Sequence, residues 1–216
     1  MWSSEVTNMI ITGIWETLYM TLVSTLVGYV IGLPMGIILT VSDKDGIKPN
    51  AVLYKILDVI ANIVRSVPFI ILLVLLIPFT RLVVGKSYGS TATIVPLVIA
   101  AAPYIARMVE SSLKEVDAGV IEAARSMGAS NFTIITKVML VEARTSLLVG
   151  ATITLGTILG YSAMSGAVGG GGLGAIAIRY GYTRWQTDIM IVTVILLIIL
   201  FQIFQTVGMK LADKFD

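Results

Sequence analysis

The chain has 216 residues, 56% of them hydrophobic and 13% charged, with a net charge of +2 and a mean hydropathy of +0.94. These values exclude an ordinary soluble domain and are typical of a membrane protein. No basic block with interleaved aromatic residues is present, so nucleic-acid binding is not expected. The chain has neither cysteine nor histidine, which excludes disulfides, thiolate catalysis and histidine-based zinc sites or triads. We therefore expect no catalytic residues, no metal site and no cofactor in this chain.

Five apolar stretches are long enough to cross about 30 Å of hydrocarbon. They predict an all-α membrane protein that forms a single domain over residues 1–216, with spans near 15–41, 56–79, 91–108, 144–166 and 188–210. An odd number of spans places the two termini on opposite sides of the membrane.

The lysine and arginine residues outside the spans are distributed unequally between the two sides. One side holds Lys44, Lys48, Lys55, Arg107, Lys114, Arg125, Lys137, Arg144, Lys210 and Lys214, and the other holds only Arg81, Lys86, Arg179 and Arg184. Because cytoplasmic loops are richer in these residues, we expect the N-terminus outside and the C-terminus in the cytoplasm.

The first span carries Gly28, Gly32 and Gly36 at strict four-residue intervals. Glycines spaced in this way leave one face of a helix without side chains, so a second helix can approach to backbone contact. Glycine is also common in membrane helices generally, but the triple repeat favours close packing against a neighbouring span.

Arg65 is the one cation inside an apolar run, and it follows Lys55 by ten residues, which is roughly 15 Å along a helix. A charge at that depth must face protein or water. Asp58, seven residues earlier, is a candidate partner. Two interpretations are open: an ion pair that holds the bundle together, or a group that lines or gates a route through it.

A short polar stretch, Asp117–Gly128, lies between the third and fourth predicted spans. Asp117 can cap the start of a helix, and Gly128 suits the left-handed residue that ends one. Val120, Ala124 and Met127 recur at helical spacing and predict one apolar stripe. From composition alone, this helix reads as a solvated connector.

The fourth predicted span differs from the aliphatic fifth because it carries a stripe of small and polar residues, namely Gly150, Thr154, Thr157, Tyr161 and Met164. A helix of this kind lines a cavity or a tight interface, and we expect it to line a pathway. We expect Met164, with Ser162 and Ser165, at the outer gate of that pathway. The glycine-rich segment 166–174 predicts a flexible outer loop, and its GxGxxG pattern lacks the strand context of a dinucleotide site.

Two sets of residues carry a resemblance to a known family. Glu122–Ala124, followed by Gly128, Val138 and Leu140 at the later spacing, resembles the EAA loop of type I ABC importer permeases. The sequence departs from that pattern at Val141, where the family usually has proline. The segments RSVPFIILLVLLIPFTRLVVG, APYIARMVE and GYSAMSGAVGGGGLG are similar to the permease subunits of bacterial methionine ABC importers.

The resemblance implies a five-span, type I permease subunit in the bacterial cytoplasmic membrane. It further implies that two copies of this chain form a homodimer on two cytoplasmic ATPase subunits, which bind ATP and Mg. An extracytoplasmic binding lipoprotein would deliver the substrate to this homodimer. Methionine or a related amino acid is the implied substrate. The segment near 117–128 would then be the coupling helix that docks on the ATPase through Glu122, Ala123, Ala124, Arg125 and Gly128.

Other functions stay open from the residues alone. The chain could be a type I permease for another small polar solute. A secondary transporter or passive channel is weaker, because coupling sites need intramembrane acids or histidines, and Asp58 is the only clear candidate. An intramembrane enzyme is weaker still, because the spans hold no histidine, cysteine or pair of acids.

Overall fold

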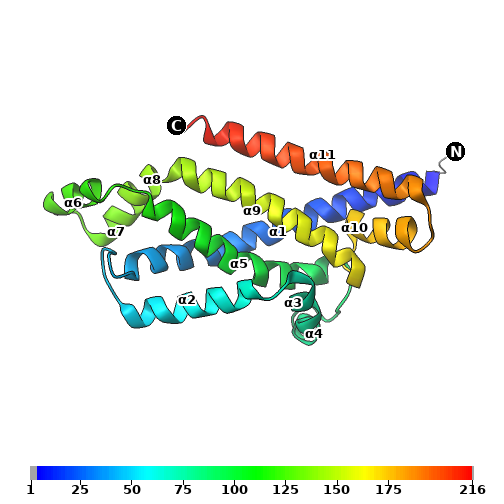
Figure 1. Ribbon diagram of the computed structural model, residues 1–216, viewed down its shortest axis with the longest axis horizontal. Coiled ribbons are helices and arrows are strands. Elements are labelled where there is room, and N and C mark those ends of the chain that lie inside the picture. The colour runs from blue at the N-terminus through cyan, green and yellow to red at the C-terminus, as the bar shows by residue number, and fades with distance from the viewer. Residues whose placement is uncertain (1–3, 216) are drawn as a thin grey trace.

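The protein is described by a computed structural model covering residues 4–215, and that part of the chain contains helices and no strand. The elements, in chain order, are α1 (Ser4–Ser42), α2 (Ala51–Ser66), α3 (Phe69–Leu75), α4 (Ile77–Val84), α5 (Ser90–Lys114), α6 (Ala118–Ser126), α7 (Asn131–Thr133), the π-helix η1 (Ile134–Met139), α8 (Leu140–Glu142), α9 (Arg144–Ser165), the 3-10 turn η2 (Gly166–Val168), α10 (Gly172–Ile176), the π-helix η3 (Ala177–Tyr182) and α11 (Thr187–Ala212). The long helices run lengthwise through an elongated molecule, with α6 and α7 at one end (Figure 1).

Among the described residues, four helical stretches are long and apolar enough to cross a membrane: Ser4–Ser42, Ser90–Lys114, Arg144–Tyr182 and Thr187–Ala212. A fifth span exists if the bent pair of α2 and α3 is one span. These positions agree with four of the predicted spans, and the all-helical membrane fold is confirmed.

The second predicted span, 56–79, is not a straight helix. α2 and α3 meet at an angle of 101°, and the chain between them is extended at Val67. Proline disfavours the helical conformation in the residue before it, so Pro68 ends α2 at this point. A second break at Leu76, two residues before Pro78, separates α3 from α4.

The glycine stripe of α1 packs against α5, as the sequence predicted. Gly28, Gly32 and Gly36 are all buried, and a Cβ atom added at Gly32 would lie 2.6 Å from the carbonyl oxygen of Ala102 and 2.7 Å from Cβ of Ile105. At those distances only glycine fits, so the two backbones are in direct contact along the middle of α1.

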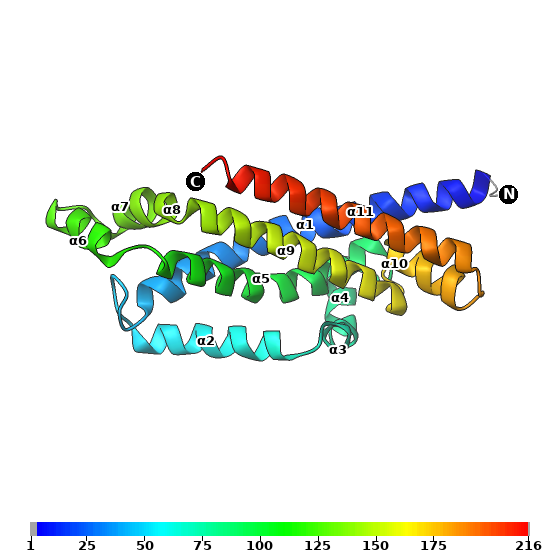
Figure 2. The same cartoon turned by 45° about the horizontal axis from the view of Figure 1, so that its top comes forward.

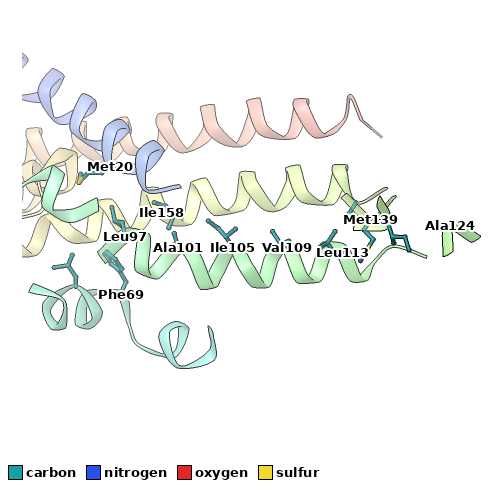
Figure 3. Close-up of a cluster of buried hydrophobic side chains, with 13 residues drawn as sticks. Met20, Phe69, Leu97, Ala101, Ile105, Val109, Leu113, Ala124, Met139 and Ile158 are labelled. Carbon is teal, nitrogen blue, oxygen red and sulfur yellow. The ribbon is translucent and has the colours of Figure 1, made fainter. Parts of the chain in front are cut away.

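The largest buried apolar cluster follows α5. Its members on this helix recur every four residues and form a continuous ridge: Leu97, Ala101, Ile105, Val109 and Leu113. Figure 3 shows this row extending from Met20 and Phe69 at one end to Ala124 and Met139 at the other. α5 is therefore the central helix, whereas α2 and α11 leave many apolar side chains exposed, as helices facing lipid do.

The glycine-rich segment 166–174 is held in place by hydrogen bonds, so the prediction that it forms a flexible outer loop is wrong. The N–H of Gly89 donates to the carbonyl oxygen of Gly169 (2.8 Å), and the Thr93 hydroxyl donates to that of Gly170 (3.2 Å). On its other side, the N–H of Gly172 donates to the Glu16 carboxylate (2.7 Å). Hydrogen bonds to α1 and to the first turn of α5 thus fix the segment between α9 and α10.

The close approach of α1 and α5 predicts the effect of replacing Gly32 with alanine. The added methyl group requires α1 and α5 to separate, and overpacking of this kind costs about 1–3 kcal/mol. The measurement is thermal unfolding of the purified protein in detergent, and a lower melting temperature is expected.

Gly160→Ala is the matched control, because a Cβ atom there meets nothing within 4 Å and the same gain in helix propensity applies. Equal melting temperatures for the two variants would contradict the glycine contact.

Candidate functional site

Helix α6 is capped at both ends as the sequence predicted. The Asp117 side chain accepts a hydrogen bond from the N–H of Gly119 (2.7 Å), and Gly128 adopts a left-handed φ of +81° just after the last turn. Both caps satisfy backbone groups that a helix end otherwise leaves unpaired. A nine-residue helix therefore has sharply defined ends and lies at the far end of the molecule (Figure 2).

The faces of α6 differ from the predicted stripe in part. Ala124 is buried in the core cluster and Ile121 packs beside it, but Val120 is 40% exposed and Met127 is 82% exposed. Met127 follows the last helical residue, so its side chain leaves the face that Ala124 defines. The exposed side of α6 therefore presents apolar surface formed by Val120 and Ala123, with Met127 just after the helix.

The remaining predicted coupling residues are exposed on α6, and one of them anchors it. Nη2 of Arg125 donates to the carbonyl oxygen of Ile47 in the connection between α1 and α2 (2.9 Å). Arg125 and Glu122 border a cleft of about 490 Å³ whose other walls include the loop after α1 and the C-terminal end of α5. The helix is thus fixed to the bundle at its inner face, whereas Glu122 and Ala123 are exposed.

The predicted pairing of Arg65 with Asp58 is wrong. Asp58 forms an ion pair with Arg107 of α5 instead, and the Arg65 guanidinium lies 6.0 Å from the ring centre of Tyr104. Residues seven apart are separated by about 10 Å along a helix axis, which is too far for a salt bridge within α2. Among the described residues, Arg65 has no ion pair and is exposed on the surface of the single chain.

The structure brings three of the predicted pathway residues into one neighbourhood. Thr157 hydrogen-bonds the Tyr104 hydroxyl at 3.5 Å, so α9 reaches the residue that lies beside Arg65. One turn later, the Tyr161 ring stacks on Phe69 with centroids 4.6 Å apart. Arg65, Thr157 and Tyr161 therefore border one polar and aromatic face formed by α2, α3, α5 and α9, which we call the pathway face.

The other predicted pathway residues lie elsewhere. Thr154, Ser162 and Ser165 are buried, and each hydroxyl donates to a carbonyl oxygen of α9 itself, at 2.8, 2.8 and 2.6 Å. Met164 is 54% exposed. The single chain thus separates Met164 from the two serines that the sequence grouped with it, because adjacent positions on a helix point in different directions.

A charge network near α6, centred on the buried Glu110, was not predicted from the sequence. Glu110 accepts from Arg107 (2.6 Å) and Lys114 (2.8 Å), and Lys114 also pairs with Asp43 after α1 (2.6 Å). The hydrogen bond from Lys114 lowers the pKa of Asp43, because it favours the ionised carboxylate. The spacing of residues 107, 110 and 114 was a usable signal, because it places all three on one face of α5.

No cluster of three or more potential metal-ligating residues occurs in the described range, residues 4–215. The fold is that of a multi-pass helical membrane protein, with a capped helix at one end and a polar and aromatic face on its long helices.

The chain belongs to the family described as "Binding-protein-dependent transport system inner membrane component", which matches residues 28–213. The chain is 48% identical over 215 residues to the probable D-methionine transport system permease protein MetI of Vibrio cholerae, covering 100% of this chain and 96% of that one. It is 52% identical to the D-methionine transport system permease protein MetI of Escherichia coli over 158 residues, which is 73% of each chain.

Chains from solved structures of ABC transporters also match this chain. A chain from inward-facing conformations of the MetNI methionine ABC transporter matches with a TM-score of 0.98 and 49% identity over the full length of both chains. A chain from an amino acid ABC transporter with histidines matches with a TM-score of 0.79 at 22% identity, which supports the fold alone. The type I importer permease fold is therefore confirmed.

Burial on α9 predicts the reactivity of cysteines introduced near its C-terminal end. Because the native chain has no cysteine, a membrane-impermeant maleimide reports only on the new thiol. Met164→Cys should be labelled rapidly in the purified protein, and Ser165→Cys, at a fully buried position, should be labelled slowly. Equal rates, in protein shown by its melting curve to be folded, would contradict the placement of these side chains.

Proposed function

We propose that this chain is the membrane-spanning subunit of an ATP-driven importer that moves methionine, or a closely related amino acid, into the cytoplasm by alternating access. The full-length similarity to methionine permeases supports the substrate, and the family supports the mode of transport. The single observation that carries the mechanism is α6, a capped helix anchored by its inner face and exposed on its outer face.

In this proposal α6 is the coupling helix that docks on a cytoplasmic ATPase subunit. Shifting an equilibrium between two arrangements of the spans from 1:99 to 99:1 requires about 5.5 kcal/mol of differential interaction. A helix with fixed ends can transmit such a load, whereas a mobile loop would absorb it. Ala123 leaves the outer surface of α6 narrow enough for a groove, Glu122 can meet a cation there, and Met127 adds apolar contact.

The assembly we propose has two copies of this chain around a two-fold axis, two ATPase subunits that bind ATP and Mg, and an extracytoplasmic binding lipoprotein. Two-fold pairing is the common way to build a symmetric route from one chain. The pathway face, with Arg65, Thr157 and Tyr161, would line that route, and Met164 would lie at its outer end. The excess of lysine and arginine at the α6 side supports a cytoplasmic α6, an outer N-terminus and a cytoplasmic C-terminus.

The experiment is methionine uptake into liposomes that contain the chain, its ATPase partner and its binding protein. Uptake should require ATP and all three components. Ala123→Phe should fold and insert into the membrane normally, because Ala123 is exposed in this chain, but should give little uptake per ATP hydrolysed, because the enlarged side chain fits the proposed ATPase groove poorly.

Ala124→Phe is the matched comparison. Ala124 is 6% exposed and lies in the core, so this change should destabilise the chain itself, as overpacking does. If Ala123→Phe assembles and imports methionine at the parental rate, α6 is only a connector. Uptake by the chain alone without ATP would support a channel or secondary transporter instead.

A further inference from the structure

Helix α2 is joined to α5 by a polar seam. Three side chains at four-residue spacing on α2 face three on α5, and we define the seam by these six residues: Tyr54, Asp58, Asn62, Arg107, Glu110 and Lys114. The apolar contribution to the same junction is small, because Ala61 is the one buried residue of α2. The apolar side chains Val52, Ile56 and Ile63 are exposed on α2. Polar bonds are therefore a main part of the attachment of α2 to α5, beside Ala61 and the half-buried Leu57 and Val64.

Glu110 is the centre of the seam. It is only 5% exposed, and its two carboxylate oxygens accept from Arg107 (2.6 Å), Lys114 (2.8 Å) and the Tyr54 hydroxyl (3.3 Å). Arg107 also pairs with Asp58 and donates to the Asn62 side-chain oxygen (3.0 Å), whereas its buried Nε has no hydrogen-bond partner among the described residues. Because Glu110 is buried, removing its charge would leave Arg107 and Lys114 without their shared partner, and loss of one member of a buried ion pair is strongly destabilising.

The two ends of the seam lie at the two functional surfaces. At one end, Lys114 pairs with Asp43, and both residues line the cleft that borders α6. At the other end, Asn62 precedes Arg65 of the pathway face by three residues on the same helix. A continuous set of charge-assisted hydrogen bonds thus runs from the seat of α6 to the helix that carries Arg65.

We propose that Glu110 is a positioning residue for transport, and that it makes α2 move as one body with the inner end of α5 when α6 is displaced. This inference rests on the proposed function. Without Glu110, α6 and α5 would still move, but α2 would follow less closely, and the route would open incompletely for each ATP hydrolysed.

The test is Glu110→Gln in the reconstituted importer, measured as methionine imported per ATP hydrolysed by assembled complexes. The amide keeps the shape of the side chain but leaves Arg107 and Lys114 with less negative charge, so the ratio should fall by at least about tenfold. Glu110→Asp, which keeps the charge, should recover part of the loss. Glu115→Gln is the matched control, because this neighbouring acid is exposed and forms no ion pair among the described residues, and its ratio should equal the parental one.

A second readout follows α2 directly. Spin labels on exposed Val59 of α2 and Ser111 of α5 should give a narrow distance distribution in the parental protein and a broad one in Glu110→Gln. If Glu110→Gln does not assemble, Lys114→Gln and Asp43→Asn, at less buried members of the network, replace it and should lower the ratio in the same direction.

The outcomes separate the two proposals. A parental complex that imports no methionine with ATP overturns the proposed function, whatever Glu110 does. A parental complex that couples normally, with an assembled Glu110→Gln complex of equal ratio and equal distance distribution, overturns only the role of Glu110.

Discussion

The backbone contact between α1 and α5 is the interaction on which the remaining structure depends. Because glycine at three successive turns of α1 leaves that face of α1 without side chains, α1 and α5 are in close contact along the middle of both helices. Beyond the C-terminal end of α1, this alignment brings Asp43 to Lys114 and places the Ile47 carbonyl where Arg125 of α6 can bind it. Nearer its N-terminal end, the same helix presents Glu16 to the N–H of Gly172. One close contact therefore positions both α6 and the glycine-rich turn.

A second constraint is that charged groups within an apolar protein need partners. Arg107, Lys114, Glu110, Asp58 and Asp43 satisfy one another across three elements of the bundle. Arg65, on the pathway face, has no acidic partner in the described part of the chain. The paired charges thus hold the bundle together, whereas the Arg65 guanidinium is available to line a route. This difference agrees with the proposed transport function.

Local features of the sequence predicted local features of the structure. The caps of α6 depend on Asp117 and Gly128 themselves, and the glycine stripe depends on spacing within one helix, so both could be read directly. The partner of Asp58 could not, because it lies 49 residues away on α5 and depends on how α2 is placed. The glycine-rich segment looked flexible because its anchors, Glu16 and Thr93, are distant in sequence. The 101° bend after α2 had a local signal in Pro68, but the long apolar run concealed it.

The central claim, that the chain is driven by an ATPase acting on α6, is tested most directly by site-specific cross-linking. A photo-reactive amino acid would be placed at Ala123 in the reconstituted importer, and a second variant would carry it at Leu82 of α4, which is 85% exposed and distant from α6 (Figure 1). The account predicts covalent capture of the ATPase subunit from position 123 and none from position 82. Methionine transport by a complex in which position 123 captures no ATPase would contradict it.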